Sequence, residues 1–184
     1  MRKLTLILAI SLVVLAWGAR PSQAQVRIYE SQTDEQISEG DTVIPGAADS
    51  AYATAANFMR WTAIFPDIKQ VIVTKQSGDD ARVTLIHTGG NRDNLHFHNR
   101  PGARTVWFED TGGRATVWAE ITFSPGSSAN MTRVHSRIFA DVTGFASLFV
   151  SDNKIRNLRR QRIFDDLTHL HAYFVKTAEV AIAP

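Results

Sequence analysis

Histidines on predicted strands are the side chains of this sequence best suited to chemistry. His87 continues the side of its strand that carries Val83 and Leu85, so we expect its imidazole to face inward. A buried imidazole needs a polar partner, which suits three roles: a structural histidine, a polar contact that orients a ligand, or a general acid or base. The residues leave these three roles open, and the structural one is the simplest.

His96 and His98 lie on the same side of the next strand, two residues apart. This spacing suits zinc or copper if His135 or Glu120, on a neighbouring strand, supplies a further ligand. No third ligand adjacent in the sequence accompanies the pair. The sequence therefore predicts no metal and no cofactor.

Basic residues gather in the first half of the predicted C-terminal helix. Their simplest role is a solvated charged surface, and the functional alternative is a cavity entrance that meets anionic head groups, on a bound lipid or on a membrane surface. By helical spacing Arg156 and Arg159 lie closest to the apolar side of the helix, so they are the candidates for such an entrance. The whole group comprises Lys154, Arg156, Arg159, Arg160 and Arg162.

Motifs for covalent catalysis and phosphate binding are missing. The Gly89-Gly90 and Gly112-Gly113 pairs read as turns and lack the G-x-x-x-x-G-K pattern of a phosphate loop. The sequence has no cysteine, and Ser151 lacks a G-x-S-x-G setting. Nucleophilic catalysis is therefore not indicated.

Residues 1–24 read as an export signal. Arg2 and Lys3 precede an apolar run, and Ala24 ends a stretch of small residues of the kind that an export peptidase reads. The apolar run is too short to span a bilayer comfortably, so cleavage is favoured over retention as a membrane anchor. We expect an exported protein, most simply a periplasmic one, with residues 25–184 as a single domain.

Charge argues against nucleic acid as a partner. The chain has 20 basic and 18 acidic residues, and loss of residues 1–24 would leave 17 basic against 18 acidic ones. A charge near zero gives no basic surface for a polyanion. The remaining 160 residues are enough for one sizeable core, which must hold without disulfides.

Short turns between successive strands predict an antiparallel sheet, because parallel neighbours would need crossovers. On the longest predicted strand Val117, Ala119 and Ile121 alternate with Trp118 and Glu120, which indicates one dry and one wet side. Strands are expected at about 26–30, 68–76, 80–88, 95–98, 105–109, 114–124 and 131–142. Helices are expected from Asp49 or Ser50 to Asn57, briefly around Phe58 to Ile64, and from Ser151 or Asp152 to about Lys176.

Two segments carry a resemblance to a known family. From Trp61 to Val73 a short aromatic helix ends at Phe-Pro-Asp and a β-branched strand follows, because Pro66 pushes Phe65 out of the helical region. On the last helix Ile163, Leu167, Leu170 and Phe174 recur at the spacing of one face. With the order of elements, these segments resemble the START/polyketide-cyclase (SRPBCC) superfamily, over nearly all of residues 25–184.

The resemblance implies an α+β helix-grip fold, also found in the birch-pollen allergen and in coenzyme Q-binding proteins. In that fold a curved antiparallel sheet, here of about seven strands, wraps a long C-terminal helix, and two short helices follow the first strand. The family mostly binds or carries lipids, sterols, quinones or polyketides in a cavity between sheet and helix, and sometimes performs cyclase or hydrolase chemistry. It has no universal catalytic residue, so none is assigned.

The residues that point inward would line such a cavity, or would simply fill the core. They are Val83, Leu85, His87, Leu95, Phe97, Val106, Phe108, Val117, Ala119, Ile121, Ser136, Ile138, Leu167, Leu170 and Phe174. Small Ala119 and Ser136 on bulky faces favour free space. The first hypothesis is an exported carrier of a hydrophobic small molecule. A cyclase or hydratase with His87 as acid or base comes second, and an envelope protein-interaction module using Trp118, His96 and His98 comes third.

Overall fold

The structure is a computed structural model that describes residues 25–111, 115–142 and 151–182. The predicted export signal, residues 1–24, lies outside the described residues. Everything said below about the fold concerns the described ranges.

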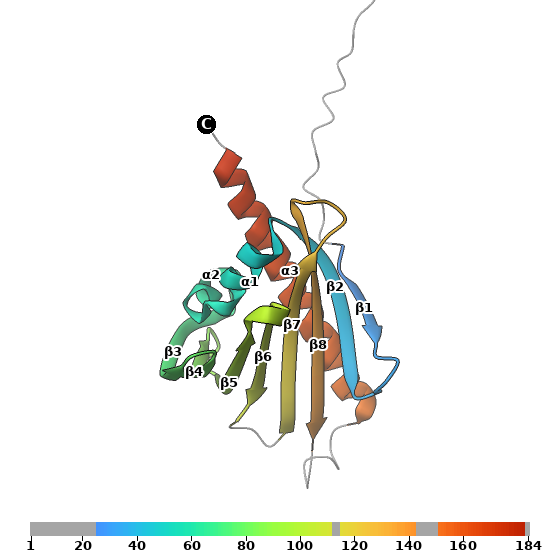
Figure 1. The fold of residues 1–184 in the computed structure, drawn as a ribbon. Helices are drawn as coiled ribbons and strands as arrows, with labels where there is room; N and C mark the ends of the chain where they lie inside the picture. Colours follow the sequence, from blue (N-terminus) through green and yellow to red (C-terminus); the bar gives the residue numbers. More distant parts are fainter. Residues whose placement is uncertain (1–24, 112–114, 143–150, 183–184) are drawn as a thin grey trace, which may run out of the picture.

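One curved antiparallel sheet of eight strands forms the body of the molecule (Figure 1). Its strand order is β1-β2-β8-β7-β6-β5-β4-β3, so β3 to β8 form a meander and β1 and β2 extend the sheet beyond β8. The strands are β1 Arg27–Glu30, β2 Ile37–Pro45, β3 Ile68–Ser77, β4 Asp80–His87, β5 Arg92–Arg100, β6 Thr105–Asp110, β7 Ala115–Pro125 and β8 Met131–Val142. The helix-grip prediction is confirmed, with eight strands in place of about seven.

Strand β2 is the element that the sequence did not reveal. Its inward-facing residues include Ser38, Gly40 and Thr42, all three buried, and this polar, glycine-containing pattern was taken as a loop. Hydrogen bonding to β8 pairs Ile37 with Phe139 and holds the segment extended. The two short helices therefore follow the second strand and not the first.

The short helices cover one end of the sheet. They are α1 Ala48–Ala56 and α2 Trp61–Ile64, joined by a 3₁₀ turn, η1 Phe58–Arg60. Asn57 accepts a hydrogen bond from the backbone N–H of Met59 and so begins this turn. Phe65 leaves the helical region with φ −112° before Pro66, as predicted. Helix α1 begins at Ala48, before either predicted capping residue.

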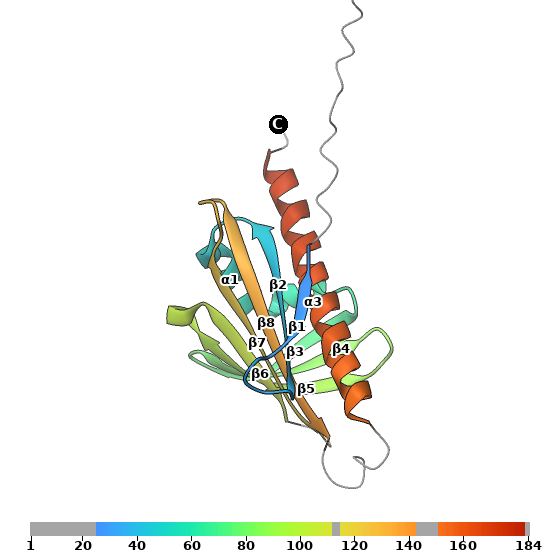
Figure 2. The same cartoon turned by 90° about the vertical axis from the view of Figure 1, so that its right-hand side faces the viewer.

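The long C-terminal helix, α3 Asp152–Ile182, lies along the inner face of the sheet (Figure 2). It packs mainly on β2 and β8, with further contacts to β1 and α2. It ends at Ile182, beyond the predicted end near Lys176, and its last turns project past the sheet (Figures 1 and 2). Among the described helices, none has both the length and the apolar character needed to cross a membrane.

An aromatic group joins the short helices to the sheet. Phe97 on β5 contacts Phe58 and Trp61, with ring centroids 4.5 and 5.1 Å apart. Trp61 also donates a hydrogen bond from its indole N–H to the carbonyl of Ala55, at 2.8 Å. These contacts fix α1 and α2 over the strands at one end, so that α3 is left to cover the other.

Candidate ligand-binding site

A cavity of about 280 Å³ lies between the inner face of the sheet, α2 and α3. Strands β4 to β8 supply most of its wall, one helix contributes Trp61, and the long helix contributes Arg162 and Asp166. The full lining comprises Trp61, Leu85, Asp93, Leu95, Phe108, Asp110, Val117, Ala119, Ile138, Arg162 and Asp166. The wall is thus apolar except for one group of charged residues, which we call the polar wall: Asp93, Asp110, Arg162 and Asp166.

Six of the residues predicted to face a cavity line this one. They are Leu85, Leu95, Phe108, Val117, Ala119 and Ile138. Seven others are core residues that pack elsewhere in the same interior, namely Val83, Phe97, Val106, Ile121, Leu167, Leu170 and Phe174. Ser136 is buried, with 1% of its surface exposed, and does not line the cavity. Inward orientation was therefore readable from alternation, whereas the position of the free space was not.

Small side chains on β7 leave room that aromatic rings border. Ala119 is buried on the inner face and pairs with Phe108 of β6 and Ile138 of β8. Phe108 and Trp61 meet edge to face, with ring centroids 5.7 Å apart, and form an aromatic side of the cavity. An apolar ligand here would be held mainly by the area it removes from water, at roughly 25 cal/mol per Å².

Asp166 is the most perturbed acid of the polar wall. Burial raises the pKa of its carboxyl to about 6, although the Arg162 guanidinium opposes this rise. Arg162 Nε donates to Asp166 Oδ2 at 3.0 Å, one helical turn away. The charge of Asp166 in turn raises the pKa of Arg162. A carboxyl with a pKa near neutrality in an apolar cavity is suited to exchange a proton with a ligand.

A chain of polar contacts connects Asp166 to the opposite side of the cavity. Arg162 lies 3.5 Å from Asp67 Oδ2, and the same oxygen lies 3.1 Å from His87 Nδ1. His87 Nε2 lies 2.8 Å from Asp93 Oδ2, so the imidazole is held between two carboxylates. Both can accept hydrogen bonds from it only when the ring carries two N–H groups. His87 thus faces inward as predicted but supports the polar wall from behind rather than lining the cavity.

The predicted entrance arginines lie at a different place. Arg156 and Arg159 border a separate hollow with Glu35 and Asp152. Arg159 is 5% exposed, donates to the Glu35 carbonyl at 2.9 Å and to Ser38 Oγ at 3.2 Å, and burial lowers its pKa. Both arginines border the apolar side of α3, as its periodicity indicated, but this part of the helix packs near β2 and β8. The arginine at the cavity is Arg162, one turn further on.

The polar wall was missed because charged residues were excluded from the inward set. Two signals were nevertheless present in the sequence. Asp93 shares strand parity with Leu95, and Asp110 shares it with Phe108. Asp166 follows Ile163 by three residues and so continues the apolar side of the helix.

The outward side of the sheet, which we call the outer face, carries the remaining candidates. Trp118 stacks on Phe139, with ring centroids 5.7 Å apart, and Arg137 lies over the indole. Arg137 pairs with Glu120 at 2.9 Å, one of the two cross-strand pairs expected from the sequence. Docking of another protein on Trp118, His96 and His98 stays a prediction.

Comparison with known proteins identifies the fold. Neither the family models nor the curated proteins match this sequence. The crystal structure of the ZhuI aromatase/cyclase from Streptomyces sp. R1128 superposes with a TM-score of 0.62 at 13% identity, over 86% of this chain and 96% of that one. A START superfamily protein from Mycobacterium smegmatis gives 0.63 at 11% identity, over 77% and 98%.

The di-domain ARO/CYC BexL, from the BE-7585A biosynthetic pathway, gives a TM-score of 0.63 at 18% identity. The match covers 80% of this chain and 48% of BexL, so this chain spans about half the length of that protein. At these identities the likeness establishes architecture. The chain has the helix-grip fold of START and polyketide aromatase/cyclase proteins.

Proposed function

We propose that this chain binds a compact hydrophobic small molecule between its sheet and α3. The observation that supports this most is the cavity of about 280 Å³, whose wall is apolar apart from the polar wall at one side. Ligand sites commonly combine such an apolar lining with a few polar groups that fix orientation. The ligand would place rings or aliphatic carbon against Phe108 and Val117, and a hydroxyl or carbonyl toward Arg162 or Asp166.

The cavity volume narrows the ligand class. Typical ligand pockets measure about 300 to 1,000 Å³, so this one is at the small end of the range. A quinone ring or a short polyketide-like ring system suits this space better than a full-length acyl chain or a sterol. We therefore place compact cyclic molecules ahead of the other classes that the helix-grip resemblance suggested.

The binding proposal is tested with naphthol, a bicyclic aromatic with one hydroxyl, by isothermal titration and by native mass spectrometry. Ala119→Phe would fill the cavity and is expected to weaken binding at least tenfold. Thr116→Phe places the same side chain on the opposite face of β7 and should leave binding unchanged. Equal binding by wild type and Ala119→Phe, or an unliganded wild type that rejects the probe, would refute the proposal.

We also propose that the protein works outside the cytoplasm as a carrier or a shielding protein for this ligand. The charged start and apolar run of residues 1–24 support export with cleavage after Ala24. Mass spectrometry of the protein from a periplasmic fraction should give a chain that begins at Gln25. A full-length chain retained in the cytoplasm would contradict this part of the proposal. Contact of Arg156 with anionic lipids belongs to the same proposal and is read out by sedimentation with anionic vesicles.

A second candidate function is catalysis of proton transfer within the same cavity, as in a cyclase or hydratase. The specific observation in its favour is the buried Asp166, with its pKa raised to about 6, beside Arg162. Such a pair can deliver or remove a proton while the arginine stabilises an oxyanion. In this scheme Asp166→Asn abolishes conversion of the bound molecule, followed by mass spectrometry, but retains naphthol binding. Unchanged conversion would leave only the carrier function.

A further inference from the structure

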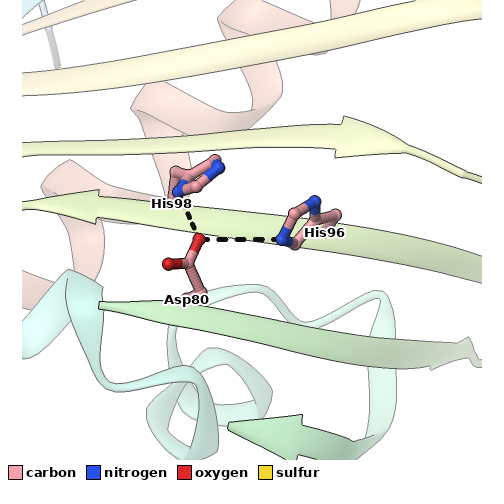
Figure 3. A group of neighbouring side chains, drawn as sticks. All are labelled: Asp80, His96 and His98. Carbon is pink, nitrogen blue, oxygen red and sulfur yellow. Dashed lines mark ion pairs between the residues drawn. The ribbon is translucent and has the colours of Figure 1, made fainter. Parts of the chain in front are cut away.

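A second group of titratable side chains lies on the outer face, away from the cavity (Figure 3). Asp80 is the first residue of β4 and pairs across the sheet with His98 of β5. His96 lies two residues along β5, on the same side as His98. Their side chains are 47%, 44% and 27% exposed, respectively, so all three can meet an ion from solvent.

The geometry of the three side chains fits a common cation. One ligand atom from each lies within 4.8 Å of the others. Asp80 Oδ1 is 3.7 Å from His96 Nε2 and also contacts His98 Nδ1 (Figure 3). A tetrahedral zinc ion with bonds near 2.05 Å holds its ligand atoms about 3.3 Å apart. Small rotations of the side chains would therefore complete the ligand set without backbone movement.

The third strand of this region orients one of the rings. Glu109 of β6 pairs with His96 in the strand register, and its Oε1 lies 3.5 Å from His96 Nδ1. A carboxylate at Nδ1 favours a hydrogen on that nitrogen and leaves the lone pair of Nε2 facing Asp80. This is the arrangement in which a carboxylate supports a metal-binding imidazole from behind.

A second histidine–carboxylate group on the outer face shows what distinguishes the first. His135 also lies near a carboxylate, with its Nδ1 3.1 Å from Asp41. Asp41, however, already accepts hydrogen bonds from Arg133 at 3.0 and 2.8 Å and from the Tyr29 hydroxyl at 2.7 Å. Its oxygens are committed to protein donors, and only one imidazole faces them.

Asp80 differs in both respects. Its Oδ1 is shielded from solvent and accepts no hydrogen bond of acceptable geometry from the described residues. Instead it faces two imidazoles, His96 and His98, as ion-pair partners. Unless both rings are protonated, this oxygen and the ring lone pairs form a set of acceptors without a cation. The site is thus built for a positive ion rather than for a protein donor.

We propose that Asp80, His96 and His98 bind a divalent transition metal, with zinc as the best match to two imidazoles and one carboxylate. A hollow of about 170 Å³ beside Asp80 and His96 leaves room for a water molecule at the fourth position. Lys75 and Arg82 also line this hollow. Their positive charge lowers the affinity for a cation, so we expect micromolar binding.

The test uses full-length, untagged protein stripped with a chelator and titrated calorimetrically with zinc chloride. Wild type should bind one equivalent, and Asp80→Asn and His98→Ala should each weaken binding at least tenfold. His135→Ala removes the histidine of the other group and should bind zinc like wild type. Circular dichroism with unchanged spectra shows that the variants remain folded.

Cobalt replacement gives an independent readout. Bound Co²⁺ in a four-coordinate site should give intense visible absorption in wild type and His135→Ala, which Asp80→Asn and His98→Ala should lose. Absence of zinc binding by wild type overturns the proposal, and so does binding that survives in His98→Ala. Naphthol binding does not involve these residues, so the result is independent of the proposed function.

Discussion

The two halves of the space between sheet and α3 are built on opposite plans. In what we call the closed half, α3 lies directly on β2 and β8, and Gly40 lets the helix approach. A Cβ atom at residue 40 would lie 2.5 Å from Cγ2 of Ile163 and 3.1 Å from Cδ1 of Leu167. In the open half, β4 to β7 face α3 across the cavity, and charged side chains of the helix line the gap.

This difference shows how one rigid helix can both anchor and leave space. Its apolar side chains are spent in the closed half, where Ile163 and Leu167 are fully buried. Arg162 and Asp166 lie beside them and point to the open half, where a shorter apolar residue could not span the gap. Close packing on one side thus positions a polar wall on the other. The following predictions test that division.

The largest effect is expected from closing the close approach itself. Gly40→Val would force α3 away from β2 and should lower the free energy of unfolding by about 4 kcal/mol, measured by urea denaturation. Gly102→Val is the matched control, because no atom lies within 4 Å of a Cβ placed there. Similar losses for both variants would show that the approach of α3 at Gly40 is not special.

Paired truncations compare the two halves directly. Leu167→Ala removes a fully buried side chain in the closed half and should cost about 3 kcal/mol. Val117→Ala enlarges a space that already exists and should cost about 1 kcal/mol, while changing the affinity for naphthol. Urea denaturation and titration calorimetry give both quantities. Equal costs would mean that the open half is packed as tightly as the closed one.

Asp166 gives the open half a distinctive dependence on pH. Its pKa is raised to about 6 from an unfolded value near 3.8, so the folded state holds the proton more tightly. The contribution to stability is therefore present at pH 4 and declines as pH rises through about 6, by at most about 3 kcal/mol. Asp166→Asn should lack this decline in urea denaturation from pH 4 to pH 7.

The neighbouring Asp165→Asn is the control for the pH experiment. Asp165 accepts a hydrogen bond from Gln161 on the solvent side of α3 and is only partly buried. Its substitution should leave the decline intact. If the difference in stability between wild type and Asp166→Asn is the same at pH 4 and pH 7, the raised pKa is refuted.

The smallest effect is expected on the outer face. Arg137→Ala breaks the pair with Glu120 and the contact with the Trp118 ring, and should cost about 1 kcal/mol. Because this side is solvated, naphthol affinity should not change. A large loss of affinity would mean that the outer face controls the interior, against the division described above.

Sequence patterns revealed most of the fold, and their failures coincide with the contrast between the halves. Alternation placed Leu85, Ala119 and Ile138 inward correctly, since apolar residues at period two need a dry side. Strand β2 was missed because its inner face consists of small or polar residues, which the closely packed helix requires. The polar wall was missed because carboxylates on an apolar side break the pattern by which that side is recognised.

The location of free space had no sequence signal of its own. Val106 and Ile121 have the same parity and character as Leu95 and Val117, yet only the latter two border the cavity. Which of them touches empty space depends on where α3 crosses the sheet. That crossing is fixed by Gly40, one residue within a segment taken as a loop.

The pairing of β2 with β8 has a consequence for how the polypeptide matures. Ile37 must wait for Phe139, and these partners are made far apart in time during synthesis. Until the last third of the chain has emerged, β1 and β2 have no neighbour, and their backbone amides and carbonyls are open to other polypeptides. Nascent chains should thus depend on a protective chaperone for their N-terminal strands longer than for the meander, whose hairpins zip up as they appear.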